Sequence, residues 1–143
     1  MKRTLIMFLF AFYSLISYAP ANTHPTMYIP KCERVISLEA LNYYPLVEAV
    51  FKWETRGSMD TLSYNAREGA YGGLQIRQCR IEHYNRLTGR NYTLEDMYDF
   101  EKAREVFLYF AKGKTFEQAA KSWNGSGPMT IKYWEGVKTY LAT

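Results

Sequence analysis

The sequence predicts a mainly helical domain with one small irregular or β-like insert. Three observations predict it: apolar residues recur at helical spacing in several segments, glycine or proline separates these segments, and one stretch is rich in turn-forming residues. A length of 143 residues suits a single domain. With 48% hydrophobic and 22% charged residues the composition is globular, which excludes disordered and low-complexity classes.

Residues 1–21 are typical of a secretory signal peptide. Two basic residues precede an uncharged apolar run, 4–19, and small residues end it at Ala19 and Ala21. The run is shorter than the roughly 20 residues that span a bilayer. We therefore predict cleavage after Ala21 and export to the periplasm or the exterior, with no membrane span left afterwards. A retained anchor is the alternative.

Residues 22–44 are predicted to form an extended lead-in, because this segment contains prolines and lacks helical periodicity. The domain is predicted over 45–143, and its first helix begins at Pro45, a residue that suits a first turn. This helix ends at Gly57 and Ser58. Its apolar face consists of Leu46, Val47, Val50, Phe51 and Trp53.

The insert is predicted within 58–73 as a short irregular hairpin, since asparagine and glycine are frequent there. A helix over 80–87 follows and stops at Gly89. Thr93 and Asp99 are expected to cap the next two helical segments, of which the second is longer. The apolar residues of that longer helix, expected in the core, are Val106, Phe107, Tyr109 and Phe110.

Two helices close the domain. Thr115 and Gln118 form a capping-box signature, which predicts a helix over 116–123. A glycine turn at 124–128 leads to the last helix. The apolar face of this last helix contains Tyr133, Trp134, Val137 and Leu141.

The charge balance argues against nucleic-acid binding. The chain has 18 Lys and Arg against 14 Asp and Glu, and loss of Lys2 and Arg3 with the signal would leave 16 against 14, a net +2. Nucleic acid requires a denser basic stripe, whereas a small positive excess suits an anionic substrate or cell surface. His24 and His83 are isolated, so we expect no zinc site and no cofactor. We expect a monomer.

Export also changes how the two cysteines are interpreted. Outside the cytoplasm, Cys32 and Cys79 are expected to form one disulfide rather than remain free thiols. The bond would join the mature N-terminal segment to a helix far along the chain. In the chain-entropy model it would stabilise the fold by roughly 3–4 kcal/mol.

Glu54 is the first candidate for chemistry. It closes the first helix, directly after Trp53 and before a loop that contains glycine. A carboxyl group there is partly desolvated and lies at the negative end of the helix dipole, and both effects raise its pKa. A carboxyl group that keeps its proton near neutral pH can act as a general acid. The alternative is an exposed glutamate at a frayed helix end.

The segment 69–76 carries residue types that suit sugar binding. Its small residues, Gly72 among them, would let backbone amides approach a ligand closely. Tyr71 could stack on a sugar ring, and Gln75 could bond hydroxyl or N-acetyl groups. Glycine turns are common, so this segment alone is a weak indication.

A third segment, 119–125, places an aromatic ring and an amide at a helix end beside a glycine. These are Trp123 and Asn124. Buried aromatic residues usually belong to the core, so this segment alone is also weak. The order and separation of the three segments after Glu54 make the combination far more specific.

Together the three segments resemble the lysozyme-like superfamily, in particular the lytic transglycosylases and goose-type lysozymes that cut peptidoglycan. The family's catalytic glutamate ends a helix in a Glu-Ser-like pair, and Glu54-Thr55 is its counterpart here. The Gly-Leu-Met-Gln-Ile motif is similar to 71–76, and the Ala-Tyr-Asn-Ala-Gly motif is similar to 122–127. The resemblance covers roughly 46–141. It implies a two-lobed helical domain with a cleft.

The resemblance implies that Glu54 protonates the oxygen between N-acetylmuramic acid and N-acetylglucosamine. A lytic transglycosylase then uses the same carboxylate as a base and forms a 1,6-anhydro end, without a second carboxylate. A lysozyme-type hydrolase would need another acid, for which Glu68 and Asp60 are the candidates. A non-catalytic module that binds peptidoglycan or acts as an envelope scaffold is a further alternative. The implied substrate-binding residues are Tyr71, Gly72, Gln75, Trp123, Asn124 and the final-helix Tyr133.

Trp123 departs from the family pattern, because it replaces the usual Tyr. The indole still offers a flat stacking face but no hydroxyl. Three arginines could meet muropeptide carboxylates, although surface solubility explains them equally well. These are Arg77, Arg80 and Arg86.

Overall fold

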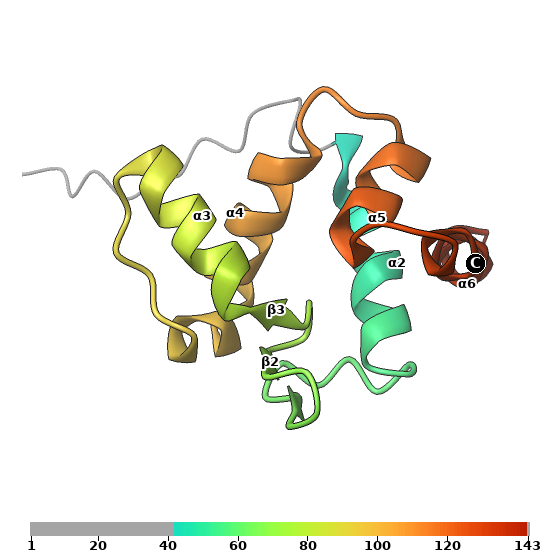
Figure 1. Ribbon diagram of the computed structural model, residues 1–143. Helices are drawn as coiled ribbons and strands as arrows, with labels where there is room; N and C mark the ends of the chain where they lie inside the picture. The colour runs from blue at the N-terminus through green and yellow to red at the C-terminus, as the bar shows by residue number, and fades with distance from the viewer. Residues whose placement is uncertain (1–41, 143) are drawn as a thin grey trace, which may run out of the picture. The chain divides into compact units, whose positions relative to one another are not determined.

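The computed structural model describes residues 42–142 and is mainly helical in this range, with one small antiparallel sheet (Figure 1). The predicted fold class is confirmed at this level. The predicted signal peptide, most of the lead-in and Cys32 lie outside the described residues. Among the residues that are described, no helix combines the length and the apolar character needed to cross a membrane.

The first described helix, α2 (Tyr44–Glu54), begins as predicted, with Pro45 in its first turn. It packs along α6 (Met129–Leu141) and also contacts α5 (Phe116–Asn124), so that the three helices form one side of the domain (Figure 1). At Gly136 a β-carbon would lie 2.2 Å from the ring of Trp53. The close approach of α6 to α2 therefore depends on this glycine.

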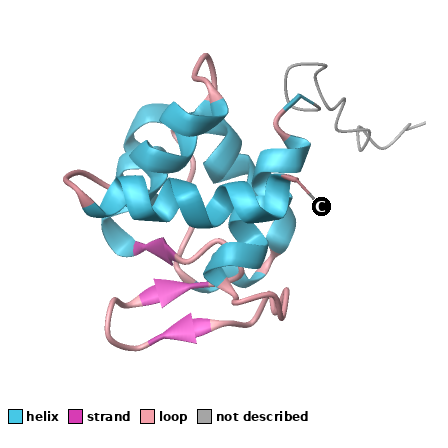
Figure 2. Ribbon diagram, turned by 90° about the vertical axis from the view of Figure 1, so that its right-hand side faces the viewer, coloured by secondary structure: helices cyan, strands magenta, loops and turns pink. Residues whose placement is uncertain are grey.

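The insert is a three-stranded antiparallel sheet in the order β1-β2-β3 (Figure 2). Its strands are β1 (Tyr64–Asn65), β2 (Ala70–Tyr71) and β3 (Ile76–Arg77). Tyr71 pairs with Tyr64 on one side and with Ile76 on the other. The hairpin predicted within 58–73 is confirmed by the first two strands. The third strand was not predicted, because it lies beyond the turn-rich stretch and runs directly into a helix.

That helix, α3 (Gln78–Thr88), ends at Gly89, whose φ of 71° is the left-handed conformation of a helix C-cap. The 3-10 helix η1 (Glu95–Tyr98) and α4 (Phe100–Ala111) follow. The Asp99 carboxylate accepts hydrogen bonds from the first turn of α4, and the Thr93 hydroxyl accepts one from the backbone of η1. The predicted cap at Asp99 is therefore confirmed, whereas the N-cap of η1 is Leu94 and Thr93 bonds to this helix from one residue before it.

The predicted capping box of α5 is also confirmed. The amide of Gln118 donates to the Thr115 hydroxyl at 3.2 Å, and the amide of Thr115 donates to the Gln118 side chain at 3.0 Å. The glycine turn after α5 then leads into α6, as predicted.

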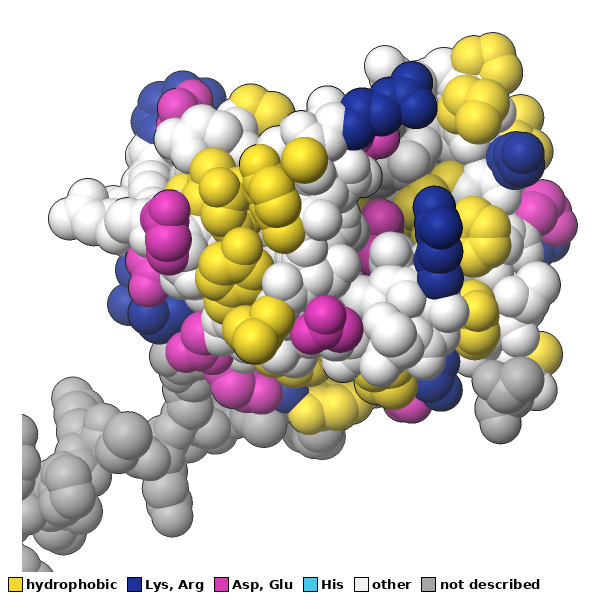
Figure 3. Space-filling view, turned by 90° about the horizontal axis from the view of Figure 1, so that it is seen from below, with side chains coloured by type: hydrophobic (Ala, Val, Ile, Leu, Met, Phe, Trp, Pro, Cys, Tyr) yellow, Lys and Arg dark blue, Asp and Glu magenta, His cyan; other side chains and the backbone are white. Residues whose placement is uncertain are grey.

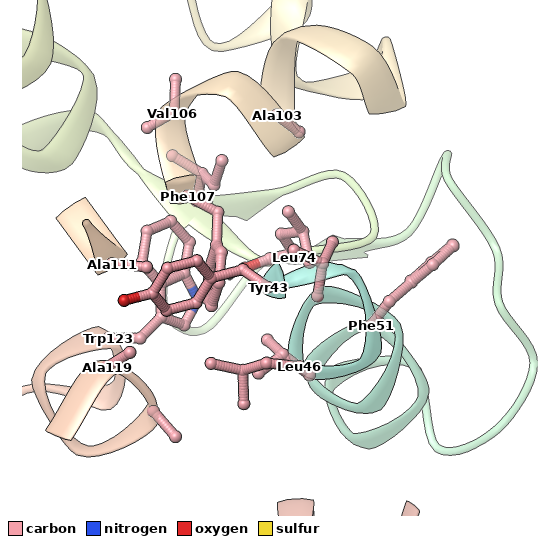
Figure 4. Close-up of a cluster of buried hydrophobic side chains, with 14 of the residues drawn as sticks. Tyr43, Leu46, Phe51, Leu74, Ala103, Val106, Phe107, Ala111, Ala119 and Trp123 are labelled. Carbon is pink, nitrogen blue, oxygen red and sulfur yellow. The ribbon is translucent and has the colours of Figure 1, made fainter. Parts of the chain in front are cut away.

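The core is formed by buried side chains of α2, α4 and α5, which pack around Leu74 from the loop before β3 (Figure 4). Val106 and Phe107 lie in it as predicted, and Phe110 packs against its edge. The prediction that Tyr109 lies in the core is wrong, because 42% of this residue is exposed. It is two positions beyond Phe107, about 200° around the helix, and therefore faces away from the core.

Candidate active site

A cleft of about 420 Å³ lies where the end of α2 meets the sheet, the start of α3, the end of α5 and the middle of α6. Figure 3 shows a hollow on this face of the molecule, with acidic atoms inside it and Lys or Arg side chains along its rim. The residues that line the cleft are Trp53, Glu54, Asn65, Glu68, Gln75, Ile76, Arg77, Cys79, Arg80, Trp123, Asn124, Gly125 and Tyr133.

Glu54 is the last residue of α2 and is half-buried in this cleft. Burial raises the pKa of its carboxyl group from the usual 4.5 to about 7. A hydrogen bond from Tyr133 lowers this pKa, the negative charge of Glu68 raises it, and the positive charge of Arg77 lowers it, each less than burial. Glu54 thus carries its proton over much of the neutral range, which a general acid requires.

Tyr133, on α6, holds the Glu54 carboxyl group in place. Its hydroxyl donates to Oε1 of Glu54 at 2.7 Å, and its ring packs edge-on against Trp53. Burial, and then the charge of Glu54, raises the pKa of the Tyr133 hydroxyl well above 10, so this group remains a donor. The resemblance implied that Tyr133 contacts the substrate; the structure places Tyr133 in the cleft lining and bonds its hydroxyl to Glu54.

The residue after Glu54 fixes the end of the helix. The buried hydroxyl of Thr55 donates to the carbonyl of Phe51 at 2.7 Å and accepts from the amide of Met59 at 3.0 Å. Arg56 and Gly57 then adopt left-handed backbone conformations with φ of 53° and 83°. These contacts stop α2 at Glu54 and turn the chain away, so that the carboxyl group stays at the edge of the cleft.

Tyr71 and Gly72 do not line the cleft, contrary to what the resemblance implied. The ring of Tyr71 packs instead against Tyr64 and Tyr98. A β-carbon on Gly72 would lie 1.9 Å from the carbonyl oxygen of Met97, so this glycine lets η1 pack against the insert rather than admitting a ligand. Gly72 therefore serves packing within the protein.

Gln75 does line the cleft, as the resemblance implied. Its backbone has a φ of 50°, which is uncommon for a residue other than glycine. The side-chain amide donates to the carbonyl of Gly72 at 2.9 Å and to the hydroxyl of Ser63 at 3.3 Å. These two bonds fix the Gln75 side chain against the insert.

Trp123 lines the cleft but offers no open face for stacking. Only 6% of it is exposed, its ring packs on Phe107, and the guanidinium of Arg80 lies 4.7 Å from its ring centre. Its indole nitrogen donates to the carbonyl of Leu74 at 3.2 Å. Trp123 therefore connects the third sequence segment to the second, and the predicted sugar-stacking role is corrected to a structural one.

The arginines near Trp123 in the cleft are also held by hydrogen bonds to backbone carbonyls of the protein. Arg80 donates to the carbonyls of Ser122 and Trp123, at the end of α5. Arg77 donates to the carbonyl of Asn124 at 3.4 Å. Asn124 lines the cleft, as the resemblance implied. Arg86 is exposed and lies outside the lining.

The two candidates for a second carboxylate differ in position. Glu68 lines the cleft with Glu54, and its side chain is 54% exposed and 3.9 Å from Arg77. Asp60 is exposed and is not part of the lining. Its carboxylate accepts from the amide of Leu62 at 2.9 Å, which makes it a turn-forming residue.

Sequence reasoning missed a second hollow that adjoins Glu54. Its volume is about 400 Å³, and it shares Trp53, Glu54, Asn65 and Gln75 with the cleft while adding Arg56 and Tyr140. Because they share these four residues, the two hollows adjoin at Glu54 and are treated as two arms of one groove. The position of Arg56, two residues after Glu54, was the available indication of this second arm.

Cys79 lines the cleft at the start of α3, is exposed and has no disulfide partner among residues 42–142. Its predicted partner, Cys32, is not among the described residues, so the disulfide stays a prediction. Within residues 42–142 no group of three His, Cys, Asp or Glu side chains is placed to hold a metal ion.

Comparison with known proteins adds no further evidence about this site. No protein-family model matches the chain, and no curated protein or solved structure is significantly similar to it.

The contact between Tyr133 and Glu54 leads to a test by pH dependence. We expect Tyr133→Phe to raise the pKa of Glu54, because the hydroxyl bond that lowers it is lost. Since the protonated acid is the active form, the alkaline limb of kcat/KM against pH should move to higher pH, while kcat falls because the carboxyl group is less well oriented. A lowered rate with an unmoved limb would contradict this role of Tyr133.

Proposed function

We propose that this chain is an exported peptidoglycan-cleaving enzyme of lysozyme-like fold, a lytic transglycosylase with Glu54 as general acid and base. The bond that it cuts joins N-acetylmuramic acid to N-acetylglucosamine. The observation that carries the proposal is the Glu54 carboxyl group, with a pKa of about 7, at a cleft beside the Tyr133 hydroxyl. The three sequence segments of the resemblance support the same assignment.

The shape of the groove supports a polymeric substrate. A general acid that cleaves within a glycan strand must have room for sugars on both sides of the bond. Two arms of about 420 and 400 Å³ adjoin at Glu54, and amide side chains suited to sugar hydroxyl and N-acetyl groups, Asn65 and Gln75, line both. The second arm also contains aromatic rings, Trp53 and Tyr140, which suit sugar faces.

In the proposed mechanism, Glu54 gives its proton to the bridging oxygen as the bond to the muramic acid C1 breaks and positive charge develops at that sugar. The acetamido group of the substrate supports this charge. The Glu54 carboxylate then takes the proton of the muramic acid 6-hydroxyl, whose oxygen bonds to C1 and closes the 1,6-anhydro ring. Glu54 is protonated again at the end, and Tyr133 keeps its carboxyl group oriented throughout.

A lysozyme-type hydrolase is the second candidate, because a second carboxylate, Glu68, lines the same cleft. In that case Glu68 would activate water. We expect Glu68→Gln to leave most of the activity of a transglycosylase, at most a few-fold lower, because Glu68 is half-exposed and beside Arg77. A loss of a hundredfold or more, the size typical of a general base, would support the hydrolase instead.

The test of the proposed function is the chemistry of the products. The mature protein is incubated with purified sacculi, and soluble products are identified by mass spectrometry. We expect muropeptides with 1,6-anhydro ends. Reducing ends would identify the hydrolase, and saturable binding to sacculi without soluble products would identify a non-catalytic module.

A further inference from the structure

The second arm of the groove contains a positive charge that no residue within 42–142 pairs with. Arg56 is exposed and lines this arm. Its side chain forms no ion pair or hydrogen bond with any residue of the described range, 42–142. The arginines of the first arm differ, because Arg80 donates to carbonyls of α5 and Arg77 faces Glu68 at 3.9 Å.

With Glu54 protonated, the lining of each arm has one excess positive charge, from Arg77 and Arg80 against Glu68 in the first arm and from Arg56 in the second. The arms therefore differ in how these cations are partnered and not in net charge. The first arm contains a carboxylate, Glu68, that offsets Arg77. The second arm has Glu54 as its one carboxyl group among the residues that line it. Because Glu54 is largely protonated below about pH 7, Arg56 decides the charge of this arm in mildly acidic solution. A guanidinium next to a sugar-binding groove suits a carboxylate, which it can bind through two parallel hydrogen bonds.

We propose that Arg56 binds a carboxylate of the glycan strand and so selects muramic-acid-containing strands over neutral N-acetylglucosamine polymers. This inference rests on the proposed function and names a selectivity residue for it. Two groups of the substrate carry such a carboxylate. In peptide-free strands it is the lactyl group of muramic acid, and in peptide-bearing strands it belongs to the stem peptide.

Binding is measured calorimetrically in a Glu54→Gln background, so that no strand is cut. The probes are a peptide-free muramyl tetrasaccharide, the same tetrasaccharide with stem peptides, and chitotetraose as the neutral strand. We expect Arg56→Gln to weaken binding of the carboxylate-bearing strands roughly fivefold, the effect of one solvent-facing ion pair, and to leave chitotetraose unchanged. Arg56→Lys should retain only part of the affinity, because it keeps the charge but not the two parallel hydrogen bonds, and high salt should reduce the difference.

Arg67→Gln is the matched control, because Arg67 is exposed on the hairpin but lines neither arm. If Arg56→Gln weakens binding of the peptide-free strand alone, Arg56 binds the lactyl carboxylate. If it weakens binding of the peptide-bearing strand alone, Arg56 binds a carboxylate of the stem peptide. Equal effects on all three strands, or none, would overturn the inference while leaving the proposed function intact. A Glu54→Gln parent that binds no strand at all would overturn the proposed function and this inference with it.

Discussion

Replacing Glu54 by Gln is expected to abolish the release of soluble products from sacculi, with a loss of about a thousandfold or more. The amide has nearly the same shape as the carboxyl group but no transferable proton, and one general acid typically contributes a factor of about 10²–10⁴. In the proposed mechanism the same group is also the base, so both steps fail together. The rate of product release from sacculi measures the effect.

Glu48→Gln is the matched control for this variant. Glu48 lies on the same helix and loses the same charge, but it is paired with Lys52 on the surface and is not part of the cleft lining. We expect its activity to equal that of the unmodified protein. Full activity of the Glu54 variant would show that Glu54 does not carry the reaction.

Stability should depend on pH through the same carboxyl group. Between about pH 4.5 and pH 7 the folded protein holds a proton on Glu54 that the unfolded chain has released. The free energy of unfolding therefore falls as the pH rises through this window, by up to about 3 kcal/mol from Glu54 alone. Glu54→Gln removes this dependence, so the variant should gain stability relative to the unmodified protein as the pH increases.

Urea unfolding at several pH values between about 4.5 and 8 measures this difference. The comparison with Glu48→Gln again separates the effect of burial from the loss of one charge, because Glu48 is exposed and paired with Lys52. If the free energy of unfolding of both variants changed with pH in the same way as that of the unmodified protein, the Glu54 carboxyl group would have an ordinary pKa.

Local sequence patterns predicted the elements that position the site. The helix that ends at Glu54, the stop at Gly89 and the capping box at Thr115 depend on residues within one or two turns of each other, and all three are present. The position of Glu54 at a cleft was also predictable in outline. The cleft was implied by the resemblance, whereas the residue pattern itself predicted only a partly desolvated carboxyl group at the end of an amphipathic helix.

Contacts between distant segments were not predictable in this way. Trp123 is 49 residues from Leu74, to which its indole donates, and 43 residues from Arg80, which covers its ring. A sequence motif specifies the residue type, but it does not show which side chains pack against the face of an aromatic ring. For the same reason Gly72 was interpreted as a ligand contact although it makes room for the carbonyl of Met97.

The second arm was missed for a related reason. Arg56 follows the helix end in a left-handed conformation, and it lines the arm together with Tyr140 of the last helix. Neither the turn of the backbone nor the closeness of the last helix could be read from the spacing of residues along the chain. The sequence showed only that a cation, Arg56, follows the candidate acid, Glu54, by two residues.

The pKa of the Glu54 carboxyl group is the most direct test of the central claim. It can be measured by NMR in protein labelled with ¹³C at glutamate side-chain carboxyl carbons, with the Glu54→Gln variant assigning the signal. We expect the Glu54 carboxyl group to titrate with a midpoint near 7, and this midpoint should be higher in Tyr133→Phe. A midpoint near 4.5, the ordinary value for a glutamate in water, would contradict it.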